Sequence, residues 1–120
     1  MNIEQEKLEW YDFNQETVQA LTEDGSDVSK PHTIEHHFAH ADFDVLEKAA
    51  VDAFKSGFEV GDAEELMLDD GGTIFCFDAV VERILDVEVI NQDTDKLLAI
   101  AVKHQIHYDG WGTHFIERLS

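Results

Sequence analysis

Four of the chain's seven histidines, His32, His36, His37 and His40, fall within nine residues. Residues 32–36 read H-x-x-E-H, which is the zinc-binding motif of the inverted metalloproteases. That motif works on a helix, where residues four apart lie on the same side. The stretch therefore raises the question of a metal site, and the answer depends on whether it folds as a helix or as a strand.

The residues around these histidines favour a strand. Pro31 precedes the stretch, and Ile34, His36 and Phe38 alternate with their neighbours at the period of two that is typical of strands. On a strand, residues four apart are separated by about 13 Å, so one metal ion cannot reach two of these histidines. We predict structural or solvated histidines and no metal or cofactor. A metal site in a small histidine-dependent enzyme, and partner binding or pH sensing, stay as alternatives.

Other residues with chemical potential occur in ordinary structural contexts. The single cysteine, Cys76, lies in an apolar, strand-like run, where a thiol usually serves as a small core residue. The acidic pairs at 64–65 and 69–70 are most simply solvated surface on such an acidic chain. The sequence contains no nucleophile elbow, phosphate loop or dinucleotide fingerprint.

Residues 108–113, Tyr-Asp-Gly-Trp-Gly-Thr, place a tryptophan between two glycines. One interpretation is that Trp111 packs in the core beside glycines that let a helix approach. The other is that a bulge or turn displays Trp111 as an aromatic contact for a protein partner.

Charge narrows the class of partner. The 120 residues contain 27 Asp and Glu against 8 Lys and Arg, giving a net charge of −19 and a pI near 4.3. Nucleic-acid binding needs cations that displace phosphate counterions, so we expect no direct contact with RNA or DNA. A basic protein is the natural complement, although acidity can also serve solubility alone.

No apolar run is long enough for a membrane span and the N-terminus does not read as a signal peptide, so we expect a cytoplasmic protein.

Hydrophobic periodicity and turn residues predict where the elements lie. We expect one domain over residues 1–120, with an N-terminal helix within 1–22 and a core over 31–116. The expected elements of the core are a strand at 32–40, a helix from Asp42 to Gly57, a strand from Phe58 that could run to Leu68, a turn at 69–72, a strand from Thr73 to Val80, a helix over 91–104 and a strand from Ile106 to Phe115. This order is that of a ferredoxin-like split βαβ domain of the α+β class. It predicts a four-stranded antiparallel sheet with helices on one face, plus the extra N-terminal helix.

Four segments in order carry a family resemblance. They are residues 23–27 (EDGSD), 33–37 (TIEHH), 46–60 with its alanine-rich helix and Gly57, and 108–113 (YDGWGT). Together they resemble the bacterial regulator of ribonuclease activity B family. The resemblance spans about residues 23–115.

The resemblance implies a cytoplasmic, non-enzymatic inhibitor of ribonuclease E with a ferredoxin-like fold. Such a protein binds the C-terminal non-catalytic region of the enzyme, alters degradosome composition and changes RNA abundance. We expect a monomer that docks on a basic segment of that region. The charged and aromatic residues of the matching segments are the candidate partner-binding residues: Glu23, Asp24, Asp27, Glu35, His37, Tyr108, Asp109 and Trp111.

Overall fold

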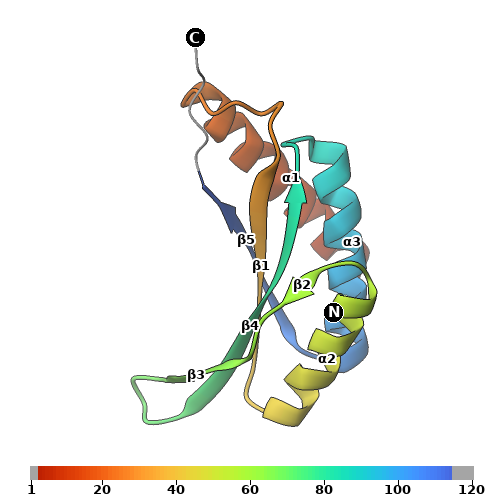
Figure 1. The fold of residues 1–120 in the computed structure, drawn as a ribbon. Helices are drawn as coiled ribbons and strands as arrows, with labels where there is room; N and C mark the ends of the chain where they lie inside the picture. Colours follow the sequence, from red (N-terminus) through yellow and green to blue (C-terminus); the bar gives the residue numbers. More distant parts are fainter. Residues whose placement is uncertain (1–2, 115–120) are drawn as a thin grey trace.

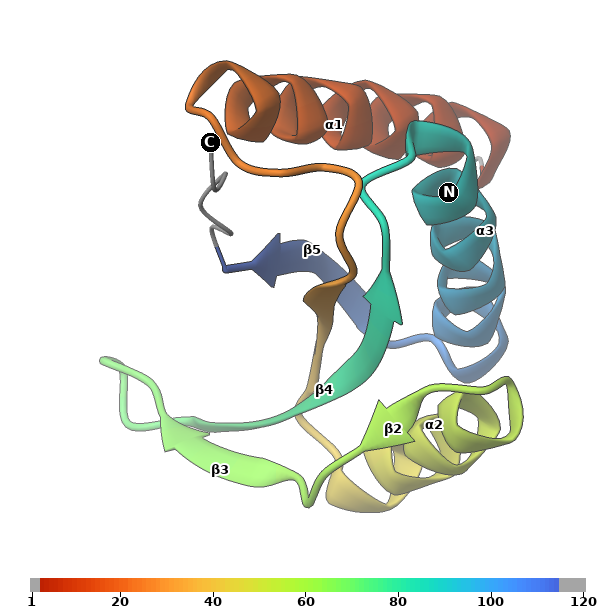
Figure 2. The ribbon, with the colours of Figure 1, turned by 45° about the horizontal axis from the view of Figure 1, so that its top comes forward.

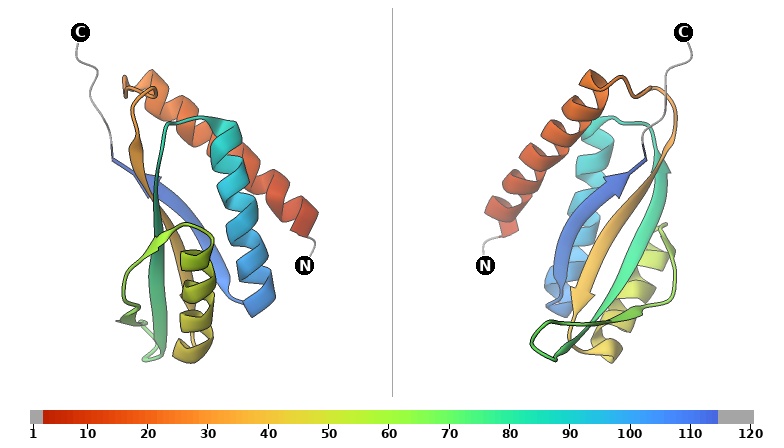
Figure 3. Two further views of the ribbon diagram at one scale, coloured as in Figure 1. Left: turned by 45° about the vertical axis from the view of Figure 1, so that its right-hand side comes forward. Right: turned by 90° about the vertical axis from the view of Figure 1, so that its left-hand side faces the viewer.

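The structure, a computed structural model, describes residues 3–114 and consists of three helices and five strands over that range (Figure 1). The elements in chain order are α1 Ile3–Glu23, β1 His32–His40, α2 Phe43–Lys55, β2 Glu59–Val60, β3 Glu64–Met67, β4 Thr73–Arg83, α3 Val87–His104 and β5 His107–Thr113. All three helices lie on one side of the sheet (Figure 3). The predicted α+β class and the extra N-terminal helix are therefore confirmed. Among these helices, none is long and apolar enough to cross a membrane.

The strands form one antiparallel sheet in the order β2-β4-β1-β5, and β3 pairs with β4 as well. The long central pair, β1 with β4, runs in register from His32 opposite Arg83 to His40 opposite Phe75. β2 and β3 occupy the same edge of β4, and β5 forms the opposite edge. Each of the helices α2 and α3 thus links two strands that have an antiparallel strand between them. The closer likeness to ferredoxin-like domains stays a prediction.

The prediction of four strands was wrong because the edge strand is broken. Val60 lies opposite Ala79, but the next paired residue, Glu64, lies opposite Cys76. Three residues, 61–63, therefore face two residues of β4, which is the geometry of a bulge. Gly61 opens this segment, and glycine inside a strand often marks such an irregularity.

The helix ends follow from capping side chains. As predicted, Asp42 is the N-cap of α2, where its carboxylate accepts hydrogen bonds from the backbone N–H groups of Asp44 and Val45. The predicted start of α3 at residue 91 was wrong: Asp86 caps the helix and α3 begins at Val87. The predicted end of β4 at Val80 was also too early, since the strand continues to Arg83. The predicted ends at residues 1, 115 and 116 lie outside the described residues.

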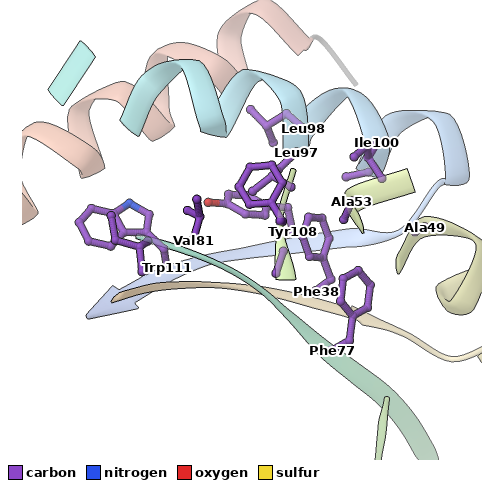
Figure 4. Packing of buried hydrophobic residues seen from close by; sticks show 14 of the residues in the cluster. Phe38, Ala49, Ala53, Phe77, Val81, Leu97, Leu98, Ile100, Tyr108 and Trp111 are labelled. Atoms are coloured by element: carbon purple, nitrogen blue, oxygen red, sulfur yellow. The ribbon is translucent and has the colours of Figure 1, made fainter. Parts of the chain in front are cut away.

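The core lies between the sheet and the helices (Figure 4). Phe38 of β1 stacks on Phe77 of β4, with ring centroids 4.9 Å apart, and Leu97 of α3 is fully buried in the same cluster. α1 packs against α3 and reaches β5, where the Trp10 ring lies 4.9 Å from that of Tyr108. Within residues 3–114, this packing leaves the opposite face of the sheet without a helix.

Candidate partner-binding face

The described helices leave one face of the sheet uncovered (Figure 3). Register and burial place charged side chains from several strands on this face. The buried residues of β1 and β4, such as Phe38 and Phe77, point toward the helices, so the alternate residues point the other way. Register then places His37 beside Asp78, and Glu64 beside Cys76. We call this surface the open face. It comprises Glu35, His37 and Ala39 of β1, Glu59 of β2, Glu64 and Leu66 of β3, Ile74, Cys76, Asp78, Val80 and Glu82 of β4, and His107, Asp109 and Gly112 of β5.

The open face holds acidic side chains without lysine or arginine. Within the five described strands, Arg83 is the one residue of either basic type. Arg83 lies on the helix side, where its Nε donates to the buried carboxylate of Asp93 at 3.0 Å. The acids of the strands, except Glu65, lie on the open face. Each of the five strands therefore presents at least one carboxylate to the same side of the sheet.

Two histidines pair with acids on this face. His37 Nδ1 lies 2.7 Å from Asp78 Oδ1, and His107 Nε2 lies 3.3 Å from Asp109 Oδ1. Cys76 lies on the same face, opposite Ala39 of β1 and Glu64 of β3 in the strand register. Burial, followed by the carboxylates of Asp78, Asp109 and Glu64, raises the pKa of its thiol. Carboxylates from β3, β4 and β5 lie on the same face as this thiol, and its raised pKa makes Cys76 a poor nucleophile at neutral pH.

The histidine stretch forms the predicted strand, and its histidines have different surroundings. His32 and His36 are fully buried on the helix side. His32 shares a hydrogen bond with Ser26 at 3.0 Å, and His36 shares one with the Tyr108 hydroxyl at 2.7 Å. Burial lowers the pKa of His36 to about 3, so its imidazole is neutral in the folded protein. Among residues 3–114, no group of three or more His, Cys, Asp or Glu side chains is placed to hold a metal ion.

Tyr108 and Trp111, two of the candidate contact residues, are buried rather than displayed. The indole Nε1 of Trp111 donates to Asn14 Oδ1 of α1 at 2.6 Å. Gly110 lies between them with a φ of +91°, and a Cβ there would lie 3.1 Å from the Trp10 ring. The glycine therefore permits the close approach of a helix, as in the core interpretation of Trp111.

The remaining candidates divide between two places. Glu35, His37 and Asp109 come together on the open face. Glu23, Asp24 and Asp27 lie at the end of α1 and in the loop that leads to β1. There the Asp27 carboxylate accepts a 2.6 Å hydrogen bond from the Ser29 hydroxyl.

Sequence reasoning missed Asp78, Glu64 and Cys76 as members of the same surface. Around Asp78 the sequence alternates: Phe77 and Ala79 are apolar and buried, whereas Asp78 between them is charged. This local alternation indicated that Asp78 points away from the core. The pairing of Asp78 with His37 needed the strand register, which no local pattern provides.

Comparison with known proteins supplies a family. The family model described as "Regulator of ribonuclease activity B" matches residues 11–113. A protein of that name from Pseudoalteromonas atlantica is 78% identical over 113 residues, covering 94% of this chain and 97% of the relative. Relatives of the same name from Alteromonas mediterranea and Shewanella denitrificans are 70% and 52% identical. They cover 98% and 97% of this chain, and the matches span 89% and 90% of those proteins.

Proposed function

The chain belongs to the regulator of ribonuclease activity B family, and from this membership we propose that it regulates ribonuclease E by binding that enzyme's C-terminal non-catalytic region. In this proposal the chain is a cytoplasmic monomer that acts by binding and not by catalysis. Occupation of the region changes the composition of the degradosome and thereby the abundance of RNA.

The observation that carries the proposal is the open face, with acids on several strands and no lysine or arginine. We expect the C-terminal region of ribonuclease E to be largely disordered and to contain arginine-rich segments that bind RNA. Carboxylates such as Glu35, Asp78 and Asp109 offer such a segment the charge that RNA phosphates offer it. Complementary charge also accelerates encounter between the two partners. Docking there would exclude RNA, or another degradosome component, from the segment.

The positions of the histidines do not support the alternative of a histidine-dependent metalloenzyme. His32 and His36, the two histidines of the H-x-x-E-H motif, are buried and take part in hydrogen bonds within the fold. An acidic module for a different basic protein is the other alternative, and the binding experiment below distinguishes it.

The test is calorimetric titration of this chain into the purified C-terminal half of ribonuclease E, with the catalytic half as the control. We expect saturable binding to the C-terminal half alone, weakening as salt concentration rises. Binding to neither half would leave an acidic module with another target. Binding to the catalytic half would contradict the proposed region.

Charge variants locate the surface. The triple variant Glu35→Gln, Asp78→Asn and Asp109→Asn removes three charges from the open face. The control is a second variant with the same change in net charge on exposed positions of α1: Glu9→Gln, Asp12→Asn and Glu16→Gln. We expect the first variant to bind much more weakly than the second. Equal weakening would show that net charge matters and the open face does not.

A further inference from the structure

The β3–β4 hairpin extends the open face with an exposed apolar segment. Within the described strands, β3 pairs with β4 alone, and the turn closes through hydrogen bonds between Leu68 and Gly72 and between Gly71 and Leu68. Figures 1 and 2 show this hairpin projecting away from α1 and α3. We call residues 64–74 the arm.

Three consecutive apolar residues lie exposed on the arm. Leu66, Met67 and Leu68 expose 48%, 82% and 45% of their surfaces. Leu66 lies opposite Ile74 on the open face, whereas Met67 points to the other side of the hairpin. A two-stranded hairpin gains little stability in water by itself, so exposed apolar side chains at its tip do not serve the fold. Contiguous exposed apolar residues with a polar rim mark interaction surfaces.

Acids surround this apolar segment. Glu64 and Glu65 precede it, and Asp69 and Asp70 follow it, all four exposed. Glu64 belongs to the group of carboxylates around Cys76, so the arm and the acidic part of the open face are continuous. An apolar centre beside a charged surface is the usual composition of a protein interface.

We propose that the arm is the apolar half of the docking surface and that it takes aliphatic or aromatic side chains of the ribonuclease segment next to that segment's basic residues. This inference rests on the proposed function and adds the composition of the bound segment, which is basic and apolar together. The carboxylates attract the segment, which passes over the edge of the hairpin so that one apolar side chain packs on Leu66 at the open face and another on Met67 at the opposite side. These two contacts fix the register of the segment and slow its dissociation. Charge complementarity favours this occupant over a second copy of the chain. Two copies would bring the acids beside each arm together, at a net charge of −19 each.

The test compares an arm variant with a matched apolar control. Leu66→Gln with Met67→Gln removes the exposed apolar surface of the arm. Val51→Gln with Phe54→Gln removes surface from α2, where the two side chains are 47% and 68% exposed. We expect the arm variant to bind the C-terminal half of ribonuclease E at least about tenfold more weakly than wild type at every salt concentration, with an unchanged salt dependence. The α2 variant should bind with the affinity of wild type. For the open-face charge variant, in contrast, the affinity should depend less on salt concentration than it does for wild type.

A second readout observes binding by the arm of the wild-type chain. The chain contains two methionines, Met1 and Met67, so [¹³C-methyl]methionine labelling gives the arm its own NMR signal. The Met67 methyl signal should shift or broaden when the C-terminal half of ribonuclease E is added, and the signal assigned to it should be absent from a Met67→Gln spectrum.

The outcomes separate the two proposals. Saturable binding with an unchanged Met67 signal would show that the arm does not contact the partner, and so would undiminished binding by the arm variant. Either result would overturn the inference about the arm and leave the proposed function standing. If wild type were a dimer and the arm variant a monomer that still binds ribonuclease E, the arm would serve self-association. That result would also overturn the inference. Failure of wild type to bind the C-terminal half would overturn both proposals.

Discussion

Replacing Asn14 by alanine should destabilise the protein, because this side chain joins three elements in the core. Asn14 is fully buried on α1. Its Nδ2 donates to Asn91 Oδ1 at 2.8 Å and to Thr94 Oγ1 at 3.1 Å, both on α3. Its Oδ1 accepts from Trp111 Nε1 of β5 at 2.6 Å. The substitution therefore removes hydrogen bonds from α1 to both α3 and β5.

The largest cost comes from the indole of Trp111. A buried donor left without a partner costs about 1–3 kcal/mol. Asn91 is half-buried, so water can replace the lost donor to its carbonyl. Alanine offsets part of the cost, since it is a better helix former than asparagine by at most about 0.7 kcal/mol. We expect a net loss of about 2 kcal/mol, or a fall in Tm of roughly 8 °C for a domain of this size.

Urea unfolding followed by circular dichroism measures this loss. Gln15→Ala, on the neighbouring exposed position, is the control and should change stability by less than about 0.5 kcal/mol. The double variant Asn14→Ala with Trp111→Phe should cost less than the sum of the single variants, because the same hydrogen bond is removed in both. A loss below about 0.5 kcal/mol for Asn14→Ala, or strict additivity with Trp111→Phe, would refute a structural role for the bond.

Three further predictions concern buried or constrained groups. Burial lowers the pKa of His36 from its ordinary value of 6.5 to about 3 in the folded protein, so the unfolded chain binds a proton first and stability falls as pH drops. Between pH 6.5 and about pH 5, wild type should lose about 1.5 kcal/mol more than His36→Gln in urea titrations, and equal losses would contradict this. Gly110→Ala should cost at least about 1 kcal/mol more than Gly25→Ala in the same assay. Both glycines have φ above +90°, but only at Gly110 would the new Cβ meet the Trp10 ring, so equal costs would exclude that clash. Arg83→Met leaves the buried Asp93 carboxylate unpaired and should lower the free energy of unfolding by about 3 kcal/mol, and an unchanged Tm would contradict this.

Local sequence patterns predicted those elements whose ends are set by residues close by in the sequence. The period of two over residues 32–40 identified β1, and Asp42 identified the start of α2 because its carboxylate caps the first turn. The start of α3 was missed because residues 87–90 are rich in β-branched side chains, which are typical of strands. The helix start becomes clear only when Asp86 is recognised as the N-cap. The broken edge at 61–63 also depends on how β4 pairs, so a single segment could not reveal it.

The candidate surface was only partly predictable, because it is assembled by pairing across the sheet. His37 and Asp78 are 41 positions apart and meet only through the β1–β4 register. Trp111 is buried because α1 crosses β5 at Gly110, a contact between opposite ends of the chain. Net charge predicted a basic partner, but not the separation of open-face acids from Arg83 on the helix side.

The single cysteine gives the central claim its most direct test, because Cys76 lies within the open face and needs no engineered label. The measurement is the rate at which iodoacetamide alkylates Cys76 at about pH 9, where part of the thiol is ionised despite its raised pKa, followed by mass spectrometry, with and without saturating C-terminal half of ribonuclease E. If the open face is the docking surface, the bound partner should slow this reaction severalfold, whereas the catalytic half should leave it unchanged. An unaltered rate at full occupancy of the C-terminal half would contradict the assignment of docking to the open face.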